Sequence, residues 1–441
     1  MDKKLFYKIG GIALMMILLL IPLSMVERQI RDRSQRQNEV QESIANGAAG
    51  EQMLAGPFLA VDYRETSLIT PDENNTKPRQ QVVERTLLLP AQLLEIDGQG
   101  NVETRHRGIY QARLFQMQLT NKGHFVVPPL ASLLPGKQFS DARLRLILRV
   151  SDPRGINNDP QVLLNGQTMR FSAPKRQGSG ESPRQMEIAL GSFDTTQEYR
   201  LNFSFPLQLT GTTRLAIAPT GEANRISLKS DWPHPNFGGR FLPGKRNVSE
   251  SGFDAQWEVS HLARNFDATL NPKSGENLSI DFVDPVNIYL QAERAVKYGL
   301  LFVALTFAGF FLTEILRRAP IHPLQYLLVG LALATFFLLL IAFSEHLPFI
   351  AAYGLAATAC IGLIAFYLAG ALGGWQQGAA FGGGLTGLYG VLYGVLLSED
   401  NALLMGSVLL FLALGTIMLA TRKLDWYSLG KQLTAGGEGA E

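Results

Sequence analysis

Charged residues are scarce in this chain, and the scarcity is greatest toward the C-terminus. Asp, Glu, Lys and Arg make up 18% of the 441 residues, against roughly 25% in average soluble proteins. Residues 324–421 contain no Lys or Arg, and their only acids are Glu345, Glu399 and Asp400. A soluble domain of this size would need more surface charge, so we expect this part to lie in a membrane.

The chain also lacks residues that several other functions require. It has one cysteine, Cys360, so no disulfide can form within it. The net charge of +2 argues against a nucleic-acid surface. The six histidines show no metal-ligand spacing, and there is no P-loop, G-x-S-x-G or C-x-x-C motif. We therefore predict no catalytic residue, metal, cofactor or nucleic-acid partner.

Six stretches approach the length of a membrane helix, about 17–25 apolar residues. The first, residues 9–26, lacks a convincing cleavage site, which favours an uncleaved anchor over a signal peptide. The others are residues 298–313, 324–343, 349–372, 378–398 and 402–421. This pattern predicts a six-helix transmembrane α-bundle, with helices 2–6 within residues 298–421 and a surrounding lipid bilayer.

Basic residues in the short loops predict the orientation. They follow the second and sixth stretches, at 317–318 and 422–431, and are absent from the loops on the other side. Because basic loops remain cytoplasmic, we expect cytoplasmic termini (1–8 and 422–441) in a bacterial inner membrane. Four arginines between 28 and 36 oppose this orientation, since they follow the first stretch on the predicted outer side.

Residues 27–297 separate the first two stretches and read as β-rich. Apolar residues alternate with polar ones in 142–150, 201–209 and 253–259, which is typical of strands with one buried face. Polar segments at either end, closing with Asn46-Gly47 and leading into Tyr298, favour juxtamembrane helices. We predict a large antiparallel, sandwich-like periplasmic domain inserted between helices 1 and 2.

The stretch "DWPHPNF" is the first candidate binding site. Prolines flank His234, and Trp232 and Phe237 are large enough to anchor the loop by burial. The segment therefore reads as an ordered connection between strands. The alternatives are a recognition loop for a periplasmic protein or cell-wall partner and, with less support, a catalytic loop.

Two further candidates lie in the apolar part. Glu345 and His346 form a polar pair at a helix boundary, which fits a solvated interfacial loop, docking to the exported domain, or proton coupling. Four glycines share one face of the fifth stretch and favour tight helix packing, with a pore lining or lipid groove as alternatives. They are Gly383, Gly387, Gly390 and Gly394.

Short motifs along the whole chain resemble those of the CreD family, the cell-envelope integrity family of Gram-negative bacteria. They include "RGIY" at 107–110, "WPHP" at 232–235, "SESGF" at 249–253, "HPLQYLLVG" at 322–330 and "DWY" at 425–427. The resemblance implies an output of the CreBC two-component system, linked to envelope integrity and colicin tolerance, with no established enzymatic activity. We predict a non-enzymatic envelope-integrity and stress-response protein of undetermined oligomeric state. Alternatives are a transporter or channel for an envelope component and a membrane-bound enzyme using His234.

Overall fold

The computed structural model describes residues 3–69, 79–172, 184–269, 275–284, 287–317, 321–397 and 402–422. The chain divides into two compact units, each described by itself. The helical unit comprises Met1–Arg36 and Val286–Glu441, and the β unit comprises Gln37–Pro285. The predicted loop at 398–401 and the predicted tail at 422–441, apart from Arg422, lie outside the described residues.

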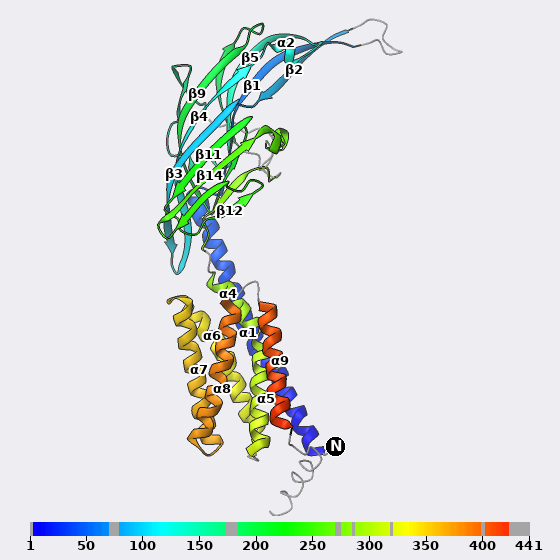
Figure 1. Cartoon of the computed structure of the whole chain (residues 1–441), viewed down its shortest axis with the longest axis vertical. Helices are drawn as coiled ribbons and strands as arrows, with labels where there is room; N and C mark the ends of the chain where they lie inside the picture. Colours follow the sequence, from blue (N-terminus) through cyan, green and yellow to red (C-terminus); the bar gives the residue numbers. More distant parts are fainter. Residues whose placement is uncertain are drawn as a thin grey trace, which may run out of the picture. The chain divides into compact units, whose positions relative to one another are not determined.

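Long apolar helices build the helical unit, where α5 to α9 run side by side (Figure 1). Four helices are long and apolar enough to span a membrane, or five if α4 and α5, which meet at a 45° bend, form one span. A shorter apolar helix covers Leu404–Leu419, and these counts refer to the described chain. The helices are α1 (Lys3–Gly47), α4 (Ile288–Lys297), α5 (Gly299–Arg317), α6 (Pro323–Ser344), α7 (Phe349–Ala371), α8 (Trp375–Leu397) and α9 (Ala402–Thr421).

Helix α1 continues well beyond its apolar part. It includes Pro22 and ends at Gly47, as the Asn46-Gly47 pair predicts. Helix α6 begins with a capping box, in which His322 accepts a hydrogen bond from Leu324 N and Gln325 reciprocates, and Pro323 occupies the first turn. Local sequence therefore defines both helix ends.

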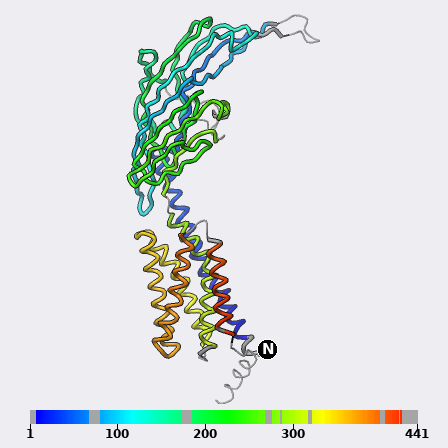
Figure 2. The backbone as a smooth tube through the Cα atoms, in the orientation of Figure 1, coloured from blue at the N-terminus to red at the C-terminus, as the bar shows by residue number. Residues whose placement is uncertain are grey.

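Two sheets form the β unit, and their long strands run side by side (Figure 2). Counted over the described residues, one has seven strands and the other eight. The strands are β1 (Gln52–Ile69), β2 (Arg79–Leu89), β3 (Leu93–Arg107), β4 (Tyr110–Val127), β5 (Gln138–Val150), β6 (Gln161–Leu164), β7 (Gln167–Arg170), β8 (Arg184–Ser192), β9 (Tyr199–Thr212), β10 (Arg214–Ala218), β11 (Ala223–Ser230), β12 (Asn236–Gly239), β13 (Lys245–Ser249), β14 (Gly252–Ser260) and β15 (Leu278–Asp281). Two short helices, α2 (Leu130–Leu133) and α3 (Phe266–Thr269), lie between strands.

The predicted period-two patterns match buried faces of these strands. In β9, Leu201, Phe203 and Phe205 are buried while their neighbours are more exposed. One hydrophobic cluster takes residues from both sheets, so the sheets pack face to face around a shared core. Most strand pairs are antiparallel, as predicted, but β1 pairs with β10 and β3 with β11 in parallel. The sheets are thus mixed.

A carboxylate in the β unit fixes the segment that follows α1. Asp152 accepts from Gly50 N at 3.1 Å and pairs with Arg154 at 2.6 Å. Arg154 also donates to the Asn46 carbonyl oxygen at 2.7 Å. The hydrogen bond from Arg154, together with those from backbone N–H groups, holds the pKa of Asp152 below its usual value. The ionised carboxylate and Arg154 together therefore connect the end of α1 and Gly50, which follows it, to the segment after β5.

Candidate functional site

The 230–246 segment is an ordered connection. Trp232 is 8% exposed and donates its indole N–H to the His234 carbonyl oxygen at 2.9 Å. Phe237 packs edge-on against Phe253 and Trp257. His234 is exposed. Since Trp232 and Phe237 pack internally, His234 is the member of this predicted trio whose side chain faces solvent.

Glu345 and His346 are oriented differently. The Glu345 side chain is 9% exposed and pairs with Arg33 of α1 at 3.3 Å. It also accepts from the Tyr289 hydroxyl at 3.5 Å. His346 is exposed. The structure therefore joins Glu345 to α1 and α4, and leaves His346 at the surface.

A second carboxylate, Glu314 of α5, is also paired with α1. Its spacing from Arg317 and Arg318 predicts local ion pairs with those arginines, whose side chains lie outside the described residues. Glu314 is 7% exposed and accepts hydrogen bonds from Lys8 Nζ, from the Tyr326 hydroxyl at 2.9 Å and from Ile321 N at 3.1 Å. Lys8 lies 306 positions from Glu314 in the sequence, so the local spacing of residues does not predict this ion pair. The sequence feature that could have indicated a paired carboxylate is the occurrence of a single acidic residue within an apolar helix.

The two ion pairs bracket the apolar part of α1. Lys8 and Arg33 are 25 residues apart on one helix, which corresponds to about 37 Å at the α-helical rise. The hydrocarbon core of a bilayer is about 30 Å thick. The pairs thus lie where charged groups can approach water or lipid headgroups.

The predicted glycine face is mostly open rather than packed. A Cβ added at Gly383, Gly387 or Gly390 would meet no atom within 4 Å, while one at Gly394 would lie 2.8 Å from Met405 Cε. Close approach of α7 and α8 instead occurs at two preceding glycines. A Cβ at Gly378 would collide with the Ala365 carbonyl, and one at Gly382 would lie 3.1 Å from Ala365 Cβ.

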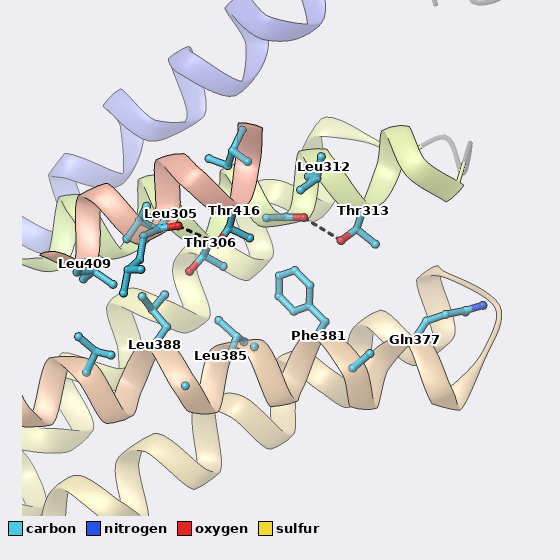
Figure 3. Close-up of a pocket in the computed structure, with 18 residues that line it drawn as sticks. Leu305, Thr306, Leu312, Thr313, Gln377, Phe381, Leu385, Leu388, Leu409 and Thr416 are labelled. Carbon is cyan, nitrogen blue, oxygen red and sulfur yellow. Dashed lines mark hydrogen bonds between the residues drawn. The ribbon is translucent and has the colours of Figure 1, made fainter. Parts of the chain in front are cut away.

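A cavity of about 540 Å³ lies between α5, α8 and α9 (Figure 3). Its lining is mainly apolar and includes Phe381, Leu385 and Gly387, and none of the described residues that line it is charged. Thr306, which is 3% exposed, also lines it, and its hydroxyl has no hydrogen-bond partner among the described residues. The cavity is suited to an uncharged, largely apolar molecule.

The β unit has a groove of different chemistry, about 390 Å³ in volume. Its lining includes Gln99, Gln116, Gln118 and Gln208, and no charged residue belongs to the lining within the described part of the β unit. Gln99, Gln118 and Gln208 stand directly opposite one another on β3, β4 and β9. Their side chains are exposed and make no hydrogen bond to another described residue.

We call this groove the amide groove. One of its walls is formed by residues 157–158, which are hydrogen-bonded to β9. Asn157 N donates to the Gln208 carbonyl oxygen at 3.0 Å, and the Asn157 side chain donates to Thr210 Oγ1 at 2.5 Å. Asn158 binds β9 through Pro206 O at 3.1 Å and Gln208 N at 2.9 Å. These contacts hold the wall in place, so the groove is preformed.

Within the described ranges, no group of three or more His, Cys, Asp or Glu side chains could hold a metal ion.

The single cysteine packs in the helical unit. Cys360 accepts from the Tyr389 hydroxyl at 3.2 Å and donates to the Ala332 carbonyl oxygen at 3.3 Å. Its thiol therefore connects α6, α7 and α8.

These features define a membrane protein with several apolar helices and a large β-rich unit. Residues 4–427 match the family described as "Inner membrane protein CreD". The chain is 35% identical over 439 residues to the Escherichia coli (strain K12) inner membrane protein CreD, a match that covers 97% of this chain and 95% of the relative. The chain therefore belongs to the CreD family of inner membrane proteins.

A solved structure adds no functional argument. The chain is similar to a crystal structure of an M1 zinc metallopeptidase from Deinococcus radiodurans at 10% identity, with a TM-score of 0.21. That match covers 44% of this chain and 42% of the metallopeptidase.

Proposed function

We propose that this protein is a non-enzymatic factor for envelope integrity and stress response whose β unit binds an uncharged polar envelope component. The observation that carries the proposal is the row of glutamines in the amide groove. Each primary amide offers two donors and an acceptor oxygen. A row of them without a charge, beside a wall that Asn157 and Asn158 hold in place, matches the hydroxyl and amide groups of a cell-wall glycan or an extended peptide backbone better than it matches an ionic ligand.

The proposal includes a topology. Six helices, α1 and α5 to α9, would span the inner membrane with both termini cytoplasmic, and the β unit would be periplasmic, inserted between the first two spans. The arginines after the first span oppose this orientation. Arg33 pairs with Glu345, and Arg31 with Glu27, so two of these positive charges are locally compensated, which supports the proposed orientation.

In vivo photocrosslinking tests the binding surface. A photoreactive residue at Gln118 should give a discrete crosslinked species, while the same residue at Glu258, also exposed on this sheet, should not. Equal crosslinking at both positions, or labelling by lipid and solvent alone, would contradict the proposal. Reporter fusions at exposed positions between 79 and 269 test the topology separately, and cytosolic activity would contradict it.

A transporter for an envelope component is the second candidate, favoured by the cavity between α5, α8 and α9. It predicts that Glu345→Gln abolishes function while the protein remains in the membrane. The third possibility, an enzyme using His234, predicts that His234→Ala does so. The envelope-factor proposal expects both variants to retain function and Gln118→Arg to lose it.

A further inference from the structure

The hydroxyl of Thr306 is buried where its surroundings are apolar. Removing a hydroxyl from water without giving it a hydrogen bond is energetically unfavourable. Five other threonines in the membrane helices avoid this cost by donating to the carbonyl oxygen four residues earlier. They are Thr313, Thr335, Thr386, Thr416 and Thr421. Thr306 makes no such bond and faces the cavity (Figure 3).

The cavity is open because small residues form part of its wall. A Cβ added at Gly384 or Gly387 of α8 would meet no atom within 4 Å, and both glycines line the cavity. Its volume of about 540 Å³ lies within the range of small-molecule sites, about 300–1,000 Å³. Space of this size beside an unpartnered hydroxyl is suited to a ligand with an apolar body.

The position of Thr306 limits what that ligand can be. Thr306 is seven residues into α5, about 10 Å along the helix axis from its first residue. The described part of the lining contains no charged side chain, so a phosphate headgroup would be left uncompensated at this depth. A small, uncharged polar head could enter with its chain.

We propose that this cavity binds a membrane lipid with a small uncharged hydroxyl or carbonyl head, of which diacylglycerol is the simplest example. The head oxygen accepts the hydrogen bond from Thr306 Oγ1, and the hydrocarbon chain packs against Phe381 and Leu385. This site is separate from the amide groove and does not depend on the ligand proposed there.

The test uses the full-length protein in nanodiscs of phosphatidylethanolamine and phosphatidylglycerol. The probe is a diacylglycerol with a diazirine in one acyl chain, and labelled peptides are identified by mass spectrometry. Wild type should be labelled on α5 and α8. Gly387→Leu fills the cavity and should abolish this labelling. Gly383→Leu is the matched control, because that glycine is equally open but does not line the cavity, and it should be labelled like wild type.

A second variant tests the hydrogen bond without adding a larger side chain to the cavity. Thr306→Val preserves the side-chain shape and removes the hydroxyl, so it should weaken competition by unlabelled diacylglycerol up to about tenfold, the loss of one hydrogen bond. Equal labelling of Gly387→Leu and Gly383→Leu would overturn the proposal, because it would indicate bulk lipid. Unchanged competition in Thr306→Val, or equal labelling by a diazirine phosphatidylglycerol, would overturn it as well.

Discussion

Removal of the Glu314 carboxylate should destabilise the helical unit strongly. Glu314→Ala leaves the Tyr326 hydroxyl and Ile321 N without their acceptor and Lys8 without its counter-ion. Removing one member of a buried ion pair costs about 3–5 kcal/mol. The Lys8 side chain is 24% exposed and regains part of its hydration, so we expect about 3 kcal/mol, near the lower limit of that range.

Two further variants separate the charge from the hydrogen bonds. Glu314→Gln retains an acceptor oxygen, so it should cost only about 1–2 kcal/mol. Lys8→Met in the wild-type background leaves Glu314 buried and uncompensated, and should cost about 3 kcal/mol. In the Glu314→Gln background the same change should be nearly neutral, which gives a coupling energy of about 3 kcal/mol.

The assay is unfolding of the full-length protein in mild detergent by titration with sodium dodecyl sulfate, followed by far-ultraviolet circular dichroism. Glu314→Ala should unfold at a lower dodecyl sulfate fraction than Glu314→Gln. The reasoning would be refuted if Glu314→Ala unfolded like wild type, or if Lys8→Met were equally harmful in both backgrounds.

Four other variants test stability at separate positions. Asn121 is fully buried in the β unit, and neither side-chain amide atom has a partner among the described residues. Asn121→Leu should therefore raise the free energy of unfolding by about 1–3 kcal/mol. A lower free energy of unfolding, measured by tryptophan fluorescence in denaturant, would contradict this. Gly378→Ala should destabilise by about 1–3 kcal/mol through collision with α7, whereas Gly383→Ala, in open space, should be neutral or stabilising by up to about 1 kcal/mol in the dodecyl sulfate titration. The ionised Asp152, whose pKa is lowered chiefly by Arg154, should contribute stability that is complete above the unfolded value of about 3.9 and lost as the pH falls through the lowered pKa; the Tm of Asp152→Asn should therefore change less than that of wild type between about pH 5 and pH 2.

The amino-acid sequence is sufficient to predict the apolar helices, the membrane location and the buried faces of the strands. These features follow from local periodicity and from the absence of charge, because a helix or strand exposes its pattern within a few turns or alternations. Membership of the CreD family could also be predicted, because short motifs such as "WPHP" at 232–235 occur along this chain in the family's order. The parallel pairing of β3 with β11 could not be predicted from the sequence, because it joins strands more than a hundred residues apart.

The folded structure is needed to show which side chains meet. It paired Glu314 with Lys8 and Glu345 with Arg33, and it brought Gln99, Gln118 and Gln208 into one row. Spacing along the chain carries no information about such contacts, because packing in three dimensions and strand register select the partner. Thr306 illustrates the same limit: the sequence marks it as one threonine among many in an apolar helix, and only the positions of α8 and α9 leave its hydroxyl facing open space.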